Sequence, residues 1–317
     1  MQRYIAHRLL QAAMVLLLVA LIVFTMLHLL PGGPGRAILG KAATPAQIAL
    51  FEHQMGYDKP IPVQFGIWLS QLLRGDLGFS YKLNRPVATA IAQALPKTAF
   101  LTAAAIVVAL AIAIPLAVLQ AVRRNKASDY VGAALSFIFY ATPTFFLGLV
   151  LAIVFGVEFH LVPTEAPQTN SLGGILANFN AMILPIMTLA LGTVSLFSRY
   201  LRSSILDNLV EDYVRTARAK GLSARRILVR HVLRNSLTSV VTLLGLSVPW
   251  LLAGSVIVEQ LFNYPGMGLL FWNEAQFNDF PVELAIVLLV GVATVLGNLF
   301  ADIGYAVLDP RVRYQRS

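Results

Sequence analysis

Residues 35–41 come closest to a known chemical motif, because they read Gly-Arg-Ala-Ile-Leu-Gly-Lys, which is most of a phosphate-binding loop. That loop needs a serine or threonine after the lysine, whose hydroxyl holds magnesium, and it follows a strand. Here the next residue is Ala42, and the segment before the motif is apolar and long enough to be a membrane helix. We therefore expect the chain to bind no ATP or magnesium and to carry no cofactor.

Other chemistry has equally little support. The chain has no cysteine, which excludes disulfides and thiolate sites, and no nucleophile-elbow pattern is present. The histidines share no metal-ligand spacing; they are His7, His28, His53, His160 and His231. We expect no catalytic residue and no metal site, and we expect His28 to be a packed or interfacial residue.

The apolar segments carry almost no charge away from their ends, and the exception is Asp302 within residues 282–308. A lone charge in lipid is costly unless it is paired, so Asp302 either forms an ion or proton site or pairs with an arginine near the end of the segment. Its position favours pairing. A carrier driven by protons or sodium would have more such carboxylates, so their absence points to an external source of energy.

Basic residues crowd segment 199–236, between two apolar segments; they are Arg199, Arg202, Arg215, Arg218, Lys220, Arg225, Arg226, Arg230 and Arg234. Asp207, Glu211 and Asp212 come before most of them, which suits a helix with acids at its start. We expect Gly221 to end this helix and Ser223 to cap a second one, at 224–233. The pair could lie on anionic lipid or dock on a protein partner, and the residues alone leave both open.

The composition indicates a membrane protein. Of the 317 residues, 57% are hydrophobic and 12% are charged, whereas soluble domains carry about 25% charged residues. So few polar side chains cannot cover a soluble domain of this size. A net charge of +9 could indicate nucleic acid, but its distribution along the chain fits a membrane orientation, so we expect lipid as a partner and no nucleic acid.

Six apolar segments are long enough to span a bilayer as helices: residues 9–30, 98–122, 130–157, 181–200, 237–258 and 282–308. We expect the first to be retained, because it is longer than the apolar core of a signal peptide and no cleavage pattern follows it. Lysine and arginine occur in both terminal tails and in the loops after the second and fourth segments, but not in 158–180 or 259–281. The positive-inside rule then places both termini in the cytoplasm.

We therefore predict an all-α membrane protein with four regions: a tail and first span (1–30), an external cap (31–97), a core (98–308) that includes the cytoplasmic loop 199–236, and a cytoplasmic tail (309–317). Within the cap, Thr44 and Pro45 are expected to start a capped helix. A second helix is expected at 64–73, followed by a turn at 74–78.

Segment 212–223 resembles the EAA loop of the membrane subunits of ABC importers, in the form used by the dipeptide, oligopeptide and nickel permease family. The resemblance extends to residues 262–268 (Phe-Asn-Tyr-Pro-Gly-Met-Gly), 279–281 (Asp-Phe-Pro) and 95–98 (Leu-Pro-Lys-Thr), and so covers nearly the whole chain. Because of the long external region, the chain looks most like the first, B-type permease of such systems.

This resemblance implies a type I importer fold in the bacterial inner membrane. It also implies a second homologous permease, two cytoplasmic ATPase subunits that hold ATP and magnesium, and an extracytoplasmic substrate-binding protein. Segment 212–223 would form the coupling helix that docks on an ATPase, through Asp212, Tyr213, Arg215, Thr216, Ala217, Ala219, Lys220, Gly221, Leu222 and Ser223. In this interpretation Ala217 permits close approach and Gly221 sets the turn.

The family transports dipeptides, longer peptides, nickel chelates, haem and glutathione, and the resemblance favours peptides as the default. The residues that bind substrate are unknown from the sequence. A secondary carrier would need an ion site near the bilayer centre, and a membrane-embedded hydrolase would need a catalytic set. Neither is present in a convincing form, so both remain the less favoured alternatives.

Overall fold

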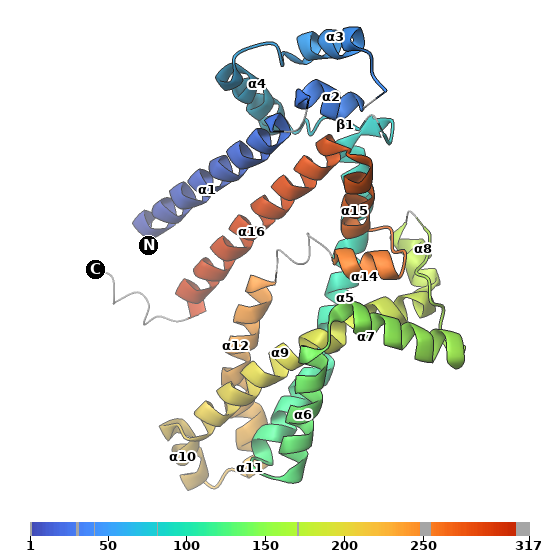
Figure 1. Ribbon diagram of the computed structural model, residues 1–317. Helices are drawn as coiled ribbons and strands as arrows, with labels where there is room; N and C mark the ends of the chain where they lie inside the picture. Colours follow the sequence, from blue (N-terminus) through green and yellow to red (C-terminus); the bar gives the residue numbers. More distant parts are fainter. Residues whose placement is uncertain are drawn as a thin grey trace. The chain divides into compact units, whose positions relative to one another are not determined.

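The computed structural model describes residues 2–29, 32–40, 42–80, 82–169, 171–247 and 255–308. These residues are mostly helical, and they include one small antiparallel sheet (Figure 1). The chain forms two compact units. Unit 1 comprises Met1–Ala99, Val248–Gln260 and Pro265–Ile303, and unit 2 comprises Phe100–Ser247, Leu261–Tyr264 and Gly304–Ser317.

The prediction of an all-α membrane protein with six spans is confirmed, provided that one bent helix pair counts as a single span. The apolar stretches within single helices are Leu9–Met26, Val87–Val122, Phe179–Leu209, Ala224–Gly245 and Phe280–Asn298. The first, second, fourth and sixth predicted spans correspond to four helices, whose bounds differ from the predicted ones: α1 (Gln2–His28), α5 (Val87–Val122), α9 (Ile183–Leu209) and α16 (Phe280–Leu308).

The third predicted span is not one continuous helix. The chain forms α6 (Ala127–Ala141) and then α7 (Thr144–Leu151), which continues as the π-helix η1 (Ala152–Glu158). Between the two parts the chain bends by 104°. Pro143 has no backbone N–H and keeps Thr142 out of the helical region, and Thr142 is extended (φ −77°, ψ 124°). The predicted span at 130–157 is therefore present only as this bent pair of helices.

The fifth predicted span, 237–258, begins much earlier than expected. Helix α11 (Ala224–Ile227) passes through the π-helical η3 (Leu228–Val232) into α12 (Leu233–Leu246) without a break. No proline or glycine interrupts residues 224–244, so nothing ends the helix where the basic residues give way to apolar ones. Pro249 lies outside the described residues, and α14 (Val256–Leu261) is a separate helix.

Residues 32–86 fold into short elements within unit 1: α2 (Gly33–Leu39), α3 (Pro45–Met55), α4 (Ile61–Leu73), β1 (Phe79–Ser80) and β2 (Arg85–Pro86). The predicted start of α3 is confirmed. The Thr44 side chain accepts from the Gln47 N–H at 3.3 Å, and Gln47 Oε1 accepts from the Thr44 N–H at 2.9 Å, which is a capping box. The predicted helix that ends at Leu73 and the turn after it are also present.

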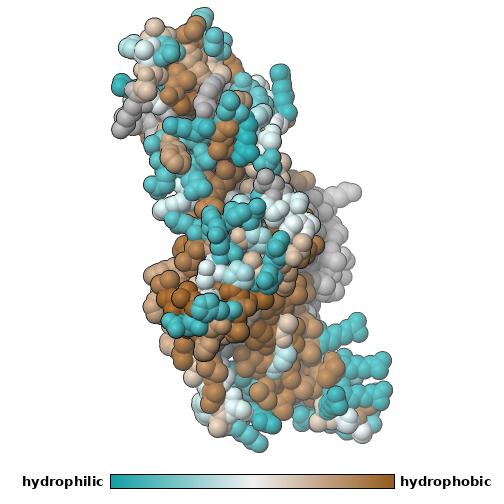
Figure 2. Space-filling model, turned by 90° about the vertical axis from the view of Figure 1, so that its right-hand side faces the viewer, coloured by the Kyte–Doolittle hydropathy of each residue, from teal (hydrophilic) through white to brown (hydrophobic). Residues whose placement is uncertain are grey.

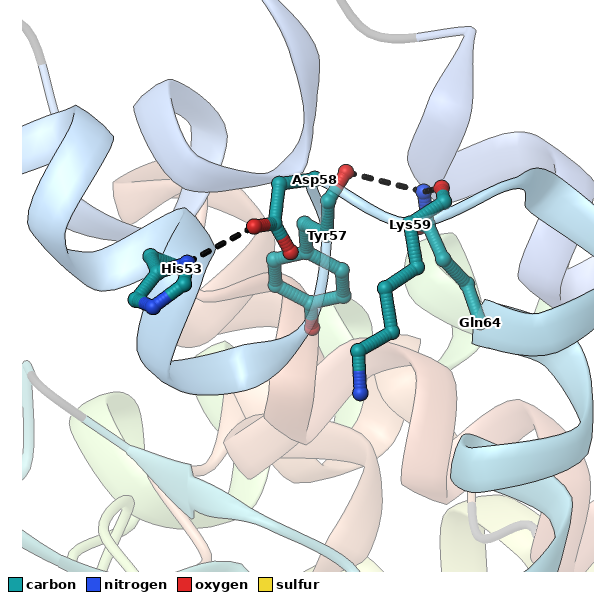
Figure 3. Close-up of polar contacts among 5 residues, drawn as sticks. All are labelled: His53, Tyr57, Asp58, Lys59 and Gln64. Atoms are coloured by element: carbon teal, nitrogen blue, oxygen red, sulfur yellow. Dashed lines mark hydrogen bonds and ion pairs between the residues drawn. The ribbon is translucent and has the colours of Figure 1, made fainter.

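Polar contacts tie the loop between α3 and α4 together (Figure 3). The Gln64 amide donates to the carbonyls of Tyr57 and Lys59 at 2.8 and 2.6 Å, and the His53 ring lies 2.7 Å from the Asp58 carboxylate, which lowers the pKa of Asp58. His28 Nε2 lies 2.7 Å from Gln64 Oε1. His28 is thus packed, as predicted, and it joins the end of α1 to this loop.

The core of unit 1 lies where α5, α15 (Met267–Phe277) and α16 meet; its buried members are Val87, Ile91, Ala94, Met267, Val282, Ala285 and Ile286. A second cluster packs Ala20 and Val23 of α1 against Leu288 of α16. In unit 2, α9 packs against α6, α7 and α12. Before α9 the chain forms α8 (Leu172–Ala177) and the 3-10 helix η2 (Phe179–Met182), which leads into α9.

Candidate functional site

The basic segment of unit 2 begins with a short helix, α10 (Asp212–Ala219). Glu211 occupies the N-cap position, Asp212 lies in the first turn and Arg218 in the last. This order of charges complements the helix dipole. The Thr216 hydroxyl donates to the Asp212 carbonyl at 3.0 Å, and the Tyr213 hydroxyl donates to Asn208 Oδ1 at 2.8 Å. The predicted first helix is therefore present.

Gly221 ends α10, as predicted, through a Schellman turn. Its N–H donates to the Arg218 carbonyl at 2.9 Å, and the Leu222 N–H donates to the Ala217 carbonyl at 3.2 Å. Gly221 has φ +77°, a left-handed backbone conformation that is unfavourable for most residues with a side chain. Among the residues that the structure describes, no atom beyond the two neighbours of Gly221 in the chain lies within 4 Å of where its Cβ would be, so space is open there for a side chain.

Ser223 stands at the N-cap of α11, but its side chain makes no capping hydrogen bond. Only its carbonyl takes part, by accepting from the Ile227 N–H at 3.0 Å. The sequence interpretation also ended the second helix near Leu233, whereas it continues into the fifth span. The turn at Gly221 therefore joins α10 directly to a helix that enters the apolar part of the chain.

The predicted site residues separate into a buried and an exposed set. Ala217 is buried, with 7% of its surface exposed, and so is Val214, which was not a predicted site residue and has 0% exposed. Ala217 therefore packs within its own chain, where the sequence interpretation had placed it against a partner. Tyr213 and Leu222 are half-buried. The exposed members are Asp212, Arg215, Thr216, Ala219, Lys220, Gly221 and Ser223, together with Arg218.

Most of the exposed charged side chains of this region are cationic. Besides those of α10, Arg225, Arg226 and Arg230 are exposed on the next helix. Glu211 and Asp212 are the acidic exceptions. The contact of Asp212 with Arg215 is long, 3.4 Å, and solvent-exposed, so it contributes little. In Figure 2, hydrophilic side chains edge the lower end of a broad hydrophobic surface, at the height of α10 and α11 in Figure 1.

A buried ion pair, which the sequence interpretation missed, supports the helix before this segment. Arg202 of α9 donates from Nε to Asp129 Oδ1 at 3.0 Å and from Nη2 to Asp129 Oδ2 at 2.8 Å. The Asn125 N–H donates to the same carboxylate at 3.0 Å, and the Arg199 guanidinium lies 5.2 Å from the centre of the Tyr140 ring. One signal was available: Arg202 falls among apolar residues that recur at helical spacing, so it needed a buried acid as its partner.

Other candidates from the sequence contribute less. Residues 33–39 form α2, which follows helix α1 rather than a strand, and Lys41 lies outside the described residues. Asp302 is part of helix α16, but its side chain lies outside the part of the chain that the structure describes. Among the residues searched, which are the described ones, no group of three or more His, Asp or Glu is arranged to hold a metal ion.

Comparison with known proteins adds independent information. Residues 113–314 match the family described as binding-protein-dependent transport system inner membrane component, and residues 1–102 match the N-terminal region described for the same components. The glutathione transport system permease protein GsiC of Salmonella choleraesuis is 39% identical over 99% of this chain and 100% of its own length. A Brucella ovis protein that its name provisionally calls a peptide permease is 37% identical over 99% of both chains.

Proposed function

The chain belongs to the inner membrane components of binding-protein-dependent transport systems, which are the multi-pass permease subunits of ABC importers. From this premise we propose that it forms, with a second permease, the pathway by which small peptides cross the membrane. An extracytoplasmic binding protein would deliver the substrate, and two separate ATPase subunits would supply the energy. The exposed surface of α10 and its Gly221 turn is the observation that carries this proposal.

In the proposed mechanism, α10 is the part of the chain to which an ATPase subunit binds. Arg215, Arg218 and Lys220 present their charges outward, while Val214 and Ala217 fix the helix to its own chain. Because the Gly221 turn leads straight into the helix Ala224–Gly245, displacement of α10 would move that helix. Differential binding of the ATPase in its two states would then shift the permease between inward- and outward-facing populations.

We further propose that both termini and α10 lie in the cytoplasm and that residues 31–97 lie outside. The distribution of Lys and Arg supports this orientation, as does the acidic, lysine- and arginine-free stretch at 158–180. The orientation also gives α10 access to ATPase subunits, and it gives residues 31–97 access to a binding protein.

Glutathione, a tripeptide, is the first substrate to test, since the Salmonella relative is named for it; nickel chelates and haem remain alternatives. We expect the reconstituted complex to import labelled glutathione or dipeptides only with ATP and the binding protein present. Competition between unlabelled glutathione and dipeptides would rank the two classes. Import of nickel or haem with no competition by either peptide would overturn the proposed substrate class.

A separate prediction concerns the phosphate-loop resemblance at residues 35–41. The purified chain, without ATPase subunits, is expected to hydrolyse no ATP above the background of a mock purification, because Ala42 replaces the hydroxyl that holds magnesium. A malachite-green assay in detergent measures this. Hydrolysis that Lys41→Ala removes would contradict the prediction.

A further inference from the structure

A glutamate is completely buried at the junction of α14 and α15 in unit 1. Glu259 has 0% of its surface exposed. Its Oε1 accepts from the Thr98 hydroxyl of α5 at 2.8 Å, and its Oε2 accepts from the N–H groups of Gly268 and Leu269 at 2.7 and 3.0 Å. The Met267 N–H in turn donates to the Thr98 hydroxyl oxygen at 2.7 Å. We call Thr98, Glu259 and the first turn of α15 the Glu259 clamp.

The clamp stabilises a carboxylate where burial alone would oppose it. Burial raises the pKa of the Glu259 carboxyl to about 7, and the hydrogen bonds from Leu269, Thr98 and Gly268 act against that rise. The two N–H groups belong to the start of α15, where the helix dipole also favours negative charge. Burying a carboxylate costs free energy, and here three hydrogen-bond donors compensate for that cost. We therefore expect Glu259 to have a specific role.

The glycines beside the carboxylate leave room for it. A Cβ at position 266 would lie 2.5 Å from both Glu259 Oε2 and Thr98 Oγ1, and a Cβ at position 268 would lie 2.8 Å from the Val256 backbone. Such approaches are far below contact distance, and the backbone of Val256 cannot move away as a flexible side chain could. Glycine at position 266 therefore leaves room for the clamp, and glycine at position 268 leaves room for the backbone of α14.

The clamp also has a distinctive place along the chain. Thr98 lies one residue before the end of the first segment of unit 1, Glu259 lies one residue before the end of the second, and Met267 lies two residues after the start of the third. All three belong to unit 1. The chain enters or leaves unit 1 close to each of these three residues. One carboxylate and one hydroxyl therefore connect three such points within unit 1.

We propose that Glu259 is a positioning residue for transport, which holds together the three chain passages at the edge of unit 1 so that movement reaching α5 is transmitted to α14 and α15. The inference rests on the proposed function, because it assigns the clamp to the conformational cycle of an importer. The partner of Glu259 is Thr98, whose hydroxyl both donates to the carboxylate and accepts from α15.

The test compares near-isosteric variants of Thr98 in the full importer complex. Thr98→Val removes the hydroxyl but keeps the shape, and Thr98→Ser keeps the hydroxyl. We expect Thr98→Val and Glu259→Ala to lower ATP-driven peptide uptake about tenfold or more, with unchanged amounts of assembled complex, while Thr98→Ser stays within about twofold. The double variant Thr98→Val/Glu259→Ala should be no worse than the worse single variant, because both act through one contact.

Amide hydrogen exchange at residues 267–269 of the purified chain measures the clamp without reference to transport. Exchange there should become faster in Thr98→Val and remain at the wild-type rate in Thr98→Ser. The proposal is overturned if Thr98→Val transports as the wild type does, if the two single losses multiply in the double variant, or if exchange does not change. A wild-type complex that imports no peptide, while exchange responds as expected, would count against the proposed function and not against the clamp.

Discussion

Replacing Gly221 by aspartate is expected to abolish ATP-driven uptake while the chain still inserts in the membrane and assembles. The position has φ +77°, which aspartate tolerates better than most residues, and the surrounding space within the chain is open. The folded chain should therefore accept the substitution. The loss would arise at the proposed interface with the ATPase, where a carboxylate on the tight turn would have to be desolvated. Uptake into proteoliposomes, normalised to assembled complex, measures it.

Gly221→Asn is the matched control, because asparagine has nearly the shape of aspartate and also tolerates a left-handed conformation but carries no charge. We expect it to retain more uptake than Gly221→Asp. Gly221→Val tests backbone strain instead, since a β-branched residue at positive φ is poorly tolerated. Normal ATP-driven uptake by Gly221→Asp would remove this turn from the coupling mechanism.

The second large effect is expected at the ion pair between α6 and α9. Arg202→Met leaves the Asp129 carboxylate, with only 6% of its side chain exposed, without its charged partner. Removing one member of a buried pair costs about 3–5 kcal/mol, and because the Arg202 side chain is 30% exposed we expect about 2–4 kcal/mol here. The loss should appear as a lower thermal unfolding midpoint of the chain in detergent.

Asp129→Asn should be milder, because it removes the charge and the partly exposed Arg202 can still reach water. The double variant Arg202→Met/Asp129→Asn should recover part of the stability that Arg202→Met loses, since no unpaired charge remains. Equal unfolding midpoints for wild type and Arg202→Met would show that the pair does not stabilise the fold. A double variant less stable than Arg202→Met would show that its two members act independently.

The sequence predicted those elements whose signals are local. Thr44 and Pro45 start a helix through contacts with residues three positions away, and Gly221 ends one through bonds within its own turn. Apolar length is sufficient to indicate a span, so six were found. The bend before Pro143 does not follow from apolar length, because a proline can kink or end a helix depending on the neighbouring helices that satisfy the freed backbone groups.

Long-range contacts could not be read in the same way. Asp129 and Arg202 are 73 residues apart, and Thr98 and Glu259 are 161 apart, so no spacing rule connects either pair. The charges and the glycine of segment 212–223 predicted its helix and turn, but they did not predict which face of that helix is buried. Ala217 looked available to a partner because it is small, whereas helical periodicity together with Val214 places it on the buried face. A three-residue spacing of apolar positions in α10 could have indicated this.

Site-directed crosslinking at Ala219 tests the central claim, that α10 is the docking element for an ATPase, most directly. The chain has no cysteine, so Ala219→Cys gives one exposed attachment point for a photoactivated crosslinker, and Leu73→Cys, at a side chain that is 82% exposed, gives a control. We predict that Ala219→Cys forms a crosslink to the ATPase subunit in the assembled importer and that Leu73→Cys does not. Crosslinks from Ala219→Cys to lipid alone, or to the extracytoplasmic binding protein, would contradict the account.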